Sequence, residues 1–493
     1  MGPSFYITRD VERAAGLLGE HTPPRQGVAP LSRGEFFVVT NRGPLADALK
    51  NIYSSQVIFA PEESGQLSTL DLMRNGFVQE EIRALSGEAP PNIIVFKTSP
   101  QIEKICTANH WSLLNPRHEI GAVLEEKIGQ WKWLSALRRA QGDNIEFDLP
   151  QVWEGKTAER LYGDLISELG ERPIVQFNRG HTGLGTFRLE SESQWIELQK
   201  KFPNREVKVS RFYEGKAYTV NAVVTQCHPE PDERVAREML RRAQHDKRVI
   251  VGNISEQLTG IPGCTNNPYA TVGNDWSAGS MLSDSVKNKI NAWADTVGAA
   301  LGLRGYQGLF GIDVIVTEEK KVILIEVNPR QPASATMESQ LQQERGEVSV
   351  MEQHLYALCH PERTLSHTEG GVEGSRTHVR PHSRGILRSA QNDSRLGGFQ
   401  LFFRNTDTTP AILAQALTPC RNQLTESGLN YLSDAASVTE TKPHEFFAFS
   451  VHANLPIPPG GEILRIQSKQ GIVETLGPDY LNSIARLRTA MPH

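Results

Sequence analysis

The stretch GLFGIDVIVTEEKKVILIEVNPR, residues 308 to 330, decides the fold of this chain. Two runs of β-branched and aliphatic residues, 312–317 and 322–327, flank the polar tetrad 318–321. Apolar runs of this length around a short polar segment predict a β-hairpin. With the turn centred between residues 319 and 320, the hairpin brings Asp313 directly opposite Glu326.

Polar side chains then meet on one face of the predicted hairpin. Asn328 and Arg330 follow Glu326 at intervals of two residues, so they project to the same side as the two acids. Like charges opposed on a sheet are destabilising unless a cation lies between them. Two carboxylates and an amide oxygen are ligands that suit Mg²⁺. The pattern therefore favours a magnesium site over the alternative, a solvated hairpin face that carries two acids by chance.

The composition is that of an ordinary soluble globular protein. The chain has 493 residues, 38% hydrophobic and 22% charged, with a formal net charge of −5. This balance, without a Lys/Arg tract, predicts no nucleic-acid partner, and no apolar run approaches the roughly 20 residues that span a bilayer. The five cysteines are scattered without a Cys-x-x-Cys pair, which indicates reduced thiols and a cytoplasmic location rather than disulfides or a zinc site.

The hairpin resembles the metal-binding end of the ATP-grasp superfamily, whose members carry an acidic residue on one strand and a Glu-x-Asn-x-Arg pattern on the next. The resemblance implies that Asp313, Glu326 and Asn328 are magnesium ligands. It places Arg330 on the basic residue that often faces the acyl phosphate or the carboxylate substrate, so Arg330 is the predicted catalytic residue. The implied cofactors are ATP and Mg²⁺, with Mn²⁺ as an alternative metal.

Alternating strands and helices are predicted in the N-terminal part of the chain. Residues 1–34 lack sustained periodicity and are expected to form a poorly ordered lead-in. Over residues 35–117 apolar strands alternate with helical patterns, which predicts a small parallel α/β domain. Its first strand is followed by Asn41, Arg42 and Gly43 rather than by a Gly-x-Gly-x-x-Gly turn, which disfavours a dinucleotide site. In the superfamily such a domain precedes the nucleotide-binding part and helps to shape the substrate cleft.

The ATP-grasp core is predicted over residues 118–365, with lobes at about 118–212 and 213–365. Residues 119–140 have helical spacing, and the segment around Lys127 resembles the one in which ATP-grasp enzymes place a first phosphate-contacting lysine. A helix that begins at Asp284 is expected to pack behind the hairpin. Residues 257–279 are rich in Gly, Asn, Pro and Thr, and residues 260–279 within this segment are predicted to form a loop.

The stretch PIVQFNRGHTGLGTFRL predicts two strands joined by a glycine-rich loop. Closely spaced glycines, here Gly183 and Gly185, let backbone N–H groups approach phosphate oxygens. In the family the strand before the loop ends in a lysine that contacts the nucleotide phosphates, and Gln176 occupies that place. Because Gln176 can donate a hydrogen bond but carries no charge, Arg179 or His181 is expected to supply the positive charge.

The stretch VKVSRFYEGKAYTVNAVV resembles the link between the two ATP-grasp lobes, where backbone groups hydrogen-bond the adenine edge. By this resemblance the hinge consists of Ser210, Arg211 and Phe212. The family usually has two glutamates in this region that hold the ribose. This chain has neither, and Glu214 is the substitute that its sequence offers.

The pattern changes beyond residue 365. Residues 366–398 contain Gly, Ser, His and Arg with few large apolar residues, which predicts a flexible linker or insertion. Residues 399–493 resume strand patterns and are predicted to form a small α+β domain with a helix over 409–428. The predicted fold class is therefore α/β plus α+β: a pre-ATP-grasp-like parallel domain, a two-lobed ATP-grasp core and a small C-terminal domain.

A magnesium clamp, a glycine loop and a neighbouring arginine imply electrostatic catalysis of phosphoryl transfer. The resemblance implies an ATP-dependent ligase that activates a carboxylic acid as an acyl phosphate for attack by an amine. The implied partners are thus small carboxylate and amine substrates, and a homo-oligomer is left open.

Two alternatives to the ligase remain. One is an enzyme like biotin carboxylase or carbamoyl phosphate synthetase, although Ser334 stands where the biotin carboxylase branch has a catalytic glutamate. The other is a catalytically degenerate ATP-binding module, which Gln176 in place of the phosphate lysine favours.

Overall fold

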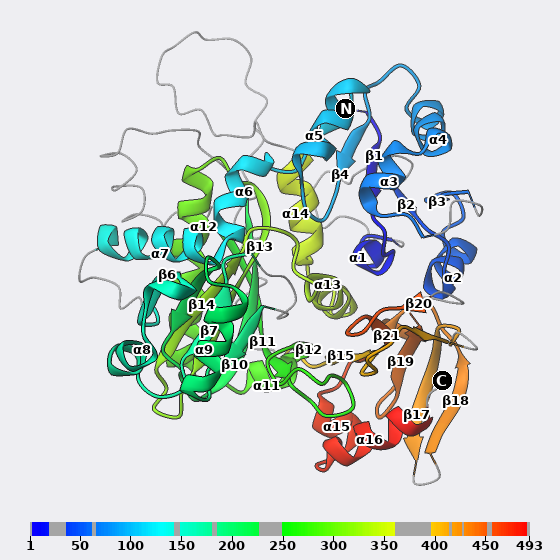
Figure 1. The fold of residues 1–493 in the computed structure, drawn as a ribbon. Helices are drawn as coiled ribbons and strands as arrows, with labels where there is room; N and C mark the ends of the chain where they lie inside the picture. The colour runs from blue at the N-terminus through cyan, green and yellow to red at the C-terminus, as the bar shows by residue number, and fades with distance from the viewer. Residues whose placement is uncertain are drawn as a thin grey trace, which may run out of the picture.

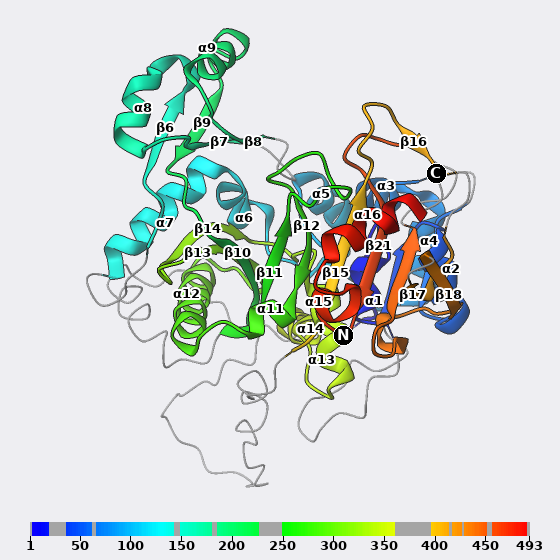
Figure 2. The same ribbon diagram turned by 90° about the horizontal axis from the view of Figure 1, so that it is seen from below.

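The structure is a computed structural model, and the chain folds into an N-terminal α/β domain, a small lobe and one long sheet that runs into the C-terminal region (Figures 1 and 2). It describes residues 2–18, 36–61, 66–141, 148–179, 185–225, 249–359, 396–413, 417–425, 428–450 and 456–490.

The N-terminal domain contains a parallel sheet of five strands in the order β3-β2-β1-β4-β5. The strands are β1 (Ser4–Ile7), β2 (Phe36–Thr40), β3 (Val57–Phe59), β4 (Asn92–Ile94) and β5 (Ser112–Leu113). The helices of this domain are α1 (Glu12–Ala15), α2 (Pro44–Ile52), α3 (Thr69–Arg74), α4 (Gly76–Ser86) and α5 (Pro100–Ala108). The parallel α/β prediction is therefore confirmed for this part of the chain.

The prediction of a poorly ordered lead-in over residues 1–34 is wrong for residues 2–18. All four residues of β1 are buried, and β1 is the central strand of the sheet. A central parallel strand is covered on both faces, so it shows no alternation, and a run of four residues is too short to reveal its structure by periodicity. Residues 19–35 lie outside the described part of the chain.

The small lobe contains an antiparallel sheet of four strands in the order β6-β9-β7-β8. The strands are β6 (Val152–Lys156), β7 (Ile174–Phe177), β8 (Thr186–Arg188) and β9 (Glu206–Ser210). The valines on one face of this sheet pack against α8 (Tyr162–Leu169) and α9 (Glu192–Lys201). Trp195 of α9 is fully buried in the same core. The helix predicted over residues 119–140 is two helices, α6 (His118–Glu125) and α7 (Lys127–Gln141), because Glu126 has an extended backbone. A short 3₁₀ turn, η3 (Thr157–Glu159), follows β6.

The long sheet has ten strands in the order β14-β13-β10-β11-β12-β15-β21-β19-β17-β18. Its first half consists of β10 (Lys216–Val224), β11 (Val249–Thr259), β12 (Thr271–Asp275), β13 (Gly308–Val316) and β14 (Val322–Asn328). Residues predicted as a loop over 260–279 instead include all of β12 and most of α11 (Trp276–Ser280), because β12 pairs with β11 in the sheet. The loop itself is confined to residues 260–270.

Helices cover both faces of this half of the sheet. The predicted helix from Asp284 is confirmed as α12 (Asp284–Leu303), and its apolar face packs against Phe310, Ile312 and Val314 of β13. The opposite face is covered by α13 (Ala335–Glu344) and α14 (Val350–Cys359), which join the core that continues into the N-terminal domain. The hairpin is therefore packed between helices on both faces of the sheet, and its polar residues Asp313, Glu326 and Asn328 lie together near one end.

Five strands of the C-terminal region continue the same sheet, while β16 and β20 pair in a small sheet of their own. Strand β15 (Phe399–Arg404) pairs with β12, and β21 (Glu462–Ser468), β19 (Phe446–Ser450), β17 (Cys420–Thr425) and β18 (Gly428–Asp434) follow. The remaining C-terminal elements are β16 (Ala411–Ile412), β20 (Pro456–Ile457), η5 (Val438–Glu440), α15 (Ile472–Leu476) and α16 (Tyr480–Ala490).

The helix predicted over residues 409–428 is wrong in the described residues, which contain β16 and β17. Strand β17 is paired with β18 on one side and with β19 on the other, and this strand pairing outweighs local helical propensity. Residues 360–395, which include most of the predicted linker, lie outside the described part of the chain.

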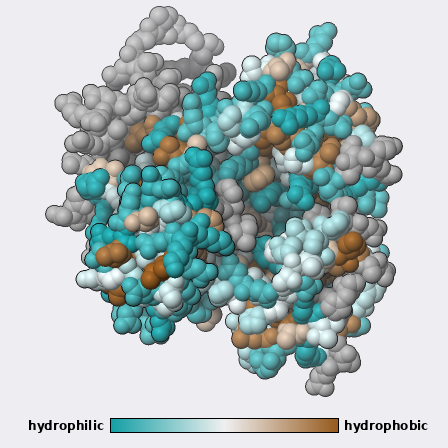
Figure 3. Space-filling model, viewed as in Figure 1, coloured by the Kyte–Doolittle hydropathy of each residue, from teal (hydrophilic) through white to brown (hydrophobic). Residues whose placement is uncertain are grey.

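The surface seen in Figure 3 is largely hydrophilic, with small separated hydrophobic patches. Exposed apolar side chains such as Leu161, Met281 and Ile412 come from different parts of the chain. None of the described helices combines the length and the apolarity that a membrane span requires.

Candidate functional site

The polar residues of hairpin β13–β14 meet as the sequence predicts. Asp313 is paired with Glu326 across the two strands. A β-bulge follows directly, since Val314 is paired with Leu324 and Ile325 has no partner on β13. The bulge shifts the pairing of β13 and β14 by one residue between the turn and the acidic pair. This shift places Glu326, rather than Ile325, opposite Asp313.

Asp313 is held by hydrogen bonds from three neighbours. Its carboxylate accepts from Thr219 Oγ1 at 2.6 Å, from Gln257 Nε2 at 2.8 Å and from Asn328 Nδ2 at 3.0 Å. Burial raises the pKa of Asp313 to about 6, and the nearby charge of Glu326 adds to this effect. The two carboxylates therefore lie close enough to repel each other, as the hairpin register requires.

Glu326 is surrounded by basic residues. Lys127, the first residue of α7, places its Nζ 2.5 Å from Glu326 Oε1. Burial alone would raise the pKa of Glu326, but Lys127, Arg330 and Lys208 together hold that pKa below its ordinary value. The structure thus brings the predicted residue Lys127 to the acidic pair, although the two are far apart in the sequence.

Asn328 and Arg330 complete the end of the hairpin. Arg330 Nη2 donates to Asn328 Oδ1 at 3.1 Å, and Arg330 Nε lies 3.4 Å from Glu125 Oε1. Glu125 also accepts from Lys97 Nζ at 2.8 Å, so this carboxylate joins α6, the N-terminal domain and the hairpin. Next along the chain, Gln331 accepts a hydrogen bond from the Tyr6 hydroxyl of β1. The N-terminal domain therefore forms one wall beside Arg330.

Gln176 lies in the small lobe on the side that faces this cluster. It is paired with Lys208 on β9 and with Thr186 on β8, and its Nε2 lies 3.4 Å from Thr186 Oγ1. Arg179 is exposed and donates to Glu126 Oε1 at 2.6 and 2.9 Å, so its charge is engaged at the start of α7. Gly185 approaches Phe177, whose N–H donates to its carbonyl at 2.9 Å.

The tip of the glycine loop, residues 180–184, lies outside the described part of the chain, and with it the predicted contacts His181 and Gly183. The stem of the loop contacts α7 through Asn178. Asn178 accepts from the N–H of Lys127 through its carbonyl and from the N–H of Ile128 through its side chain, both at 3.0 Å. The loop stem and the beginning of α7 are therefore fixed to each other.

The predicted hinge connects β9 to β10, and its residues differ in their surroundings. Ser210 is buried, Arg211 is exposed and Phe212 is half-buried under the guanidinium of Arg188, whose Cζ lies 3.8 Å from the ring centre. Glu214 is exposed at the turn before β10. The hinge thus lies between the lobes, while Glu214 projects away from the protein core.

The sequence prediction missed Lys208, a buried lysine of β9 beside Lys127 and Glu326. The alternation in VKVS places residue 208 on the face opposite Val207 and Val209, which was the available signal. Its position next to Gln176 depends on strand pairing between segments that the sequence alone does not align.

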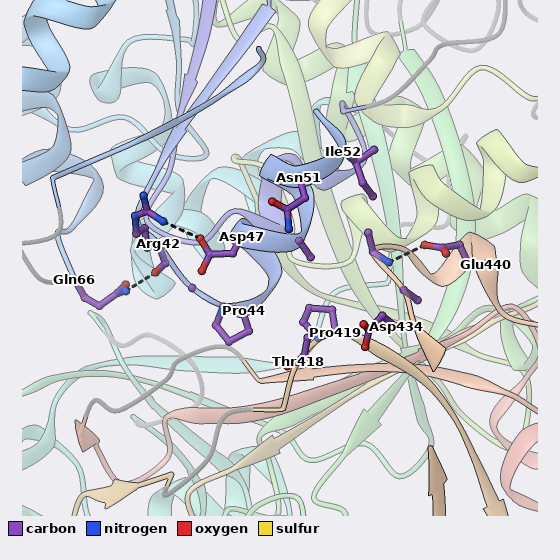
Figure 4. Close-up of a pocket in the computed structure, with 14 residues that line it drawn as sticks. Arg42, Pro44, Asp47, Asn51, Ile52, Gln66, Thr418, Pro419, Asp434 and Glu440 are labelled. Carbon is purple, nitrogen blue, oxygen red and sulfur yellow. Dashed lines mark hydrogen bonds and ion pairs between the residues drawn. The ribbon is translucent and has the colours of Figure 1, made fainter. Parts of the chain in front are cut away.

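A cavity of about 720 Å³ lies elsewhere, between α2 and the C-terminal strands. Figure 4 shows Arg42, Asp47 and Asn51 on one side of it and Asp434 and Glu440 on the other. Arg42 is engaged by Asp47 at 3.4 Å, and the Glu440 carboxylate accepts from the Ala436 N–H at 2.7 Å. This cavity shares no lining residue with the acidic hairpin.

The donor set of the hairpin end suits a hard divalent cation. Asp313, Glu326 and Asn328 offer oxygen atoms from adjacent strands, which is the chemistry that Mg²⁺ prefers. The described residues contain no group of three or more His, Cys, Asp or Glu side chains that could enclose a metal. A cation at the hairpin would therefore need further oxygen ligands from water or from a bound phosphate.

Comparisons with known proteins agree with this architecture. Residues 165–334 match the family model of an ATP-grasp domain. A comparison with curated protein sequences finds no match.

Solved structures share the fold at low sequence identity. N5-carboxyaminoimidazole ribonucleotide synthetase from Thermus thermophilus is 12% identical, with a TM-score of 0.54 over 99% of this chain and 99% of that chain. The N5-carboxyaminoimidazole synthase from Aspergillus clavatus, in complex with ADP and 5-aminoimidazole ribonucleotide, is 12% identical, with a TM-score of 0.52 over 98% and 99%. Biotin carboxylase from Campylobacter jejuni, in a β-γ-ATP complex, is 11% identical, with a TM-score of 0.54 over 95% and 87%.

Proposed function

We propose that this chain, which contains an ATP-grasp domain, is a Mg²⁺-dependent ligase that uses ATP to activate a carboxylic acid as an acyl phosphate for attack by an amine. One observation carries the proposal: the acidic end of hairpin β13–β14 faces Lys127 and Lys208, which come from α7 and from the small lobe. Oxygen ligands for a cation and ammonium groups for phosphate oxygens thus lie side by side.

The acidic and the basic residues of the site would bind different groups. Asp313, Glu326 and Asn328 would hold Mg²⁺, which supplies charge neutralisation for phosphoryl transfer when it is bound. Lys127 would move from Glu326 toward phosphate oxygens, a shift that its long flexible side chain allows. Arg330 would bind the substrate carboxylate and stabilise the charge of the acyl phosphate.

The wall formed by the N-terminal domain supports this placement of the substrate. Gln331 is tied to Tyr6 of β1 and donates to the carbonyl of Arg13 at 2.9 Å. A carboxylate bound at Arg330 would therefore lie between the hairpin and the N-terminal domain, shielded from bulk water on two sides. The amine attacks the acyl carbon and phosphate leaves, so no strong general base on the protein is needed.

A cytoplasmic location belongs to the same proposal. Among the described residues, Cys106, Cys264, Cys359 and Cys420 are buried and free. Free buried thiols support a reducing compartment.

A catalytically degenerate ATP-binding module is the second candidate, because Gln176 stands in place of the phosphate lysine. ADP release measured with a panel of carboxylic acids, with and without amines, separates the two. Release that depends on an acid supports the ligase. Tight ATP binding without turnover under all conditions supports the degenerate module.

The site itself is tested by Glu326→Ala, which should abolish Mg²⁺-dependent turnover while the far-UV circular dichroism spectrum stays unchanged. Glu318→Ala is the matched control, since this glutamate is exposed at the turn of the same hairpin. Turnover in Glu326→Ala equal to that in Glu318→Ala would refute the assignment.

A further inference from the structure

Four polar residues form one row across the small-lobe sheet. Cross-strand pairing places Glu154 beside Lys208, Lys208 beside Gln176 and Gln176 beside Thr186. Paired residues of neighbouring strands project to the same face of a sheet. Val207 and Val209 project to the other face and are buried against α8 and α9. The row therefore faces α7 and the acidic hairpin.

Lys208 is the unusual member of this row. The residue is only 4% exposed, and its side chain makes no hydrogen bond or ion pair with any residue that the structure describes. An ammonium group buried without a partner is costly, because its lost hydration is not replaced. Such a lysine is rarely kept for stability alone, so its environment calls for an anion.

The neighbours of Lys208 strengthen this conclusion. Burial lowers the pKa of Lys208 to about 8, and the charge of Lys127 acts in the same direction while that of Glu326 opposes it. Glu326 is already bonded to Lys127 at 2.5 Å. Glu154, the cross-strand neighbour of Lys208, is paired with Lys132 at 3.0 Å, so Lys208 has no carboxylate of its own beside the proposed cation site.

The beginning of α7 offers no free backbone donor for the anion in its first two residues. The first two N–H groups of α7, those of Lys127 and Ile128, already donate to Asn178 at 3.0 Å. Gln176 contributes an amide without charge. Among the described residues, the positive charge available on this side of the small lobe comes from the lysine side chains.

We propose that Lys208 contacts the phosphate oxygens of the bound nucleoside triphosphate and supplies, from the neighbouring strand, the charge that Gln176 does not carry. This inference rests on the proposed function, since it assumes that ATP binds between the small lobe and the hairpin. Gln176 would then act as a neutral donor beside Lys208. Together, Gln176 on β7 and Lys208 on β9 would provide the hydrogen bond and the charge that a single lysine at residue 176 would provide.

The test measures Mg²⁺-ATP and adenosine binding by isothermal titration calorimetry in four proteins: wild type, Lys208→Met, Lys200→Met, and the exchange variant Gln176→Lys with Lys208→Gln. A charge-assisted hydrogen bond contributes about 1.5–3 kcal/mol, so Lys208→Met should raise the Kd for ATP roughly tenfold to 150-fold. Its Kd for adenosine should stay within about twofold of the wild-type value. Lys200 is exposed on α9 and serves as the control that changes neither Kd.

The exchange variant makes the test specific. It moves the lysine by one strand on the same face of the sheet, so ATP affinity should return to within about threefold of the wild type. Lys208→Met should also keep or raise the melting temperature, because it removes an unpaired buried cation. If methionine is not accommodated, Lys208→Gln serves in the same comparison.

Each other outcome overturns a defined claim. Unchanged ATP affinity in the Lys208 variants would reject the role of Lys208 and leave the proposed function standing. Equal losses for ATP and adenosine would assign Lys208 a purely structural role. A wild-type protein that binds no Mg²⁺-ATP would reject the proposed function together with this inference.

Discussion

Two buried clusters of charge lie in different parts of this molecule, and they are compensated differently. Arg465 of β21 is paired with Glu12 of α1 and with Glu462 at 2.8 and 3.0 Å, and it stacks 4.4 Å above the ring centre of Phe402. Lys208 of β9 is as deeply buried but has no such partner among the described residues.

The difference teaches how to separate structural from functional charge. Around Arg465 two carboxylates match one guanidinium, so the cluster is complete and joins the C-terminal strands to the N-terminal domain. Around Glu326 lie two lysines and Arg330, of which Arg330 is also close to Glu125, while Asp313 is held by neutral donors. An incomplete cluster at the junction of two lobes suits a charged ligand, whereas a complete one stabilises the fold.

Arg465→Met gives the largest expected effect. Removal of the guanidinium leaves the buried Glu12 and the half-buried Glu462 without their cation, a loss that should lower the free energy of unfolding by about 3–5 kcal/mol in urea titrations. The double variant Arg465→Met with Glu12→Met should recover at least half of this loss, because Glu12 is the more buried acid. Equal instability of the single and double variants would contradict the view that charge pairing is what matters there.

Lys127→Met should show the opposite pattern. Glu326 keeps Arg330 and Lys208 nearby, so the free energy of unfolding should change by less than about 1 kcal/mol. The Kd for Mg²⁺-ATP should rise roughly tenfold to 100-fold, as expected for the loss of one charge-assisted contact. Lys132→Met on the same helix is the control, since its exposed side chain pairs with Glu154 at 3.0 Å. A large loss of stability with unchanged ATP affinity would show that Lys127, like Arg465, stabilises the fold rather than binds the nucleotide.

The sequence alone was sufficient for features set by local periodicity. The opposition of Asp313 and Glu326 is predicted from two apolar runs and a short turn, and it is confirmed, although the structure reaches it through the bulge, since the register at the turn alone would place Asp313 opposite Ile325. The apolar face of α12 is equally local, since its buried residues recur at helical spacing. Lys127 came from resemblance, and the structure brings it to Glu326.

Features that depend on distant pairing could not be predicted in the same way. Strand β1 is too short and too completely buried to show alternation. The pairing of β12 with β15 joins segments far apart in the chain and merges the C-terminal region into the long sheet. Lys208 looked like an ordinary polar residue of an alternating strand, because its significance arises from Gln176 and Glu326 on other elements.

His354 sharpens the comparison, because it is a buried titratable group that stays neutral. Burial lowers its pKa to about 3, and its Nδ1 accepts from the Leu309 N–H at 3.0 Å. The unfolded chain binds a proton below about pH 6.5 and the folded chain does not, so stability is complete above that pH and falls as the pH drops toward 3. The expected loss at pH 5.5 is about 1.4 kcal/mol relative to pH 8.

His354→Gln keeps an acceptor for the Leu309 N–H but does not titrate. The difference in unfolding free energy between wild type and this variant should therefore shift by about 1.4 kcal/mol, in favour of the variant, between pH 8 and pH 5.5. Parallel stability curves for the two proteins would show that His354 does not titrate differently on folding.

The smallest effect is expected at the other end of the hairpin that carries Glu326. Lys321 Nζ lies 3.7 Å from Asp148 Oδ1, and its side chain is 52% exposed. Exposed ion pairs contribute about 0–1 kcal/mol, so Lys321→Ala should change the free energy of unfolding by less than about 0.5 kcal/mol. Raising the salt concentration from about 0.1 to about 1 M should remove even that difference, because salt screens the electrostatic attraction between exposed charges. The ATP affinity of this variant should equal that of the wild type. If Lys321→Ala instead raised the Kd for Mg²⁺-ATP as much as Lys127→Met, burial of the lysine at the acidic pair would not be what distinguishes the two ends of the hairpin.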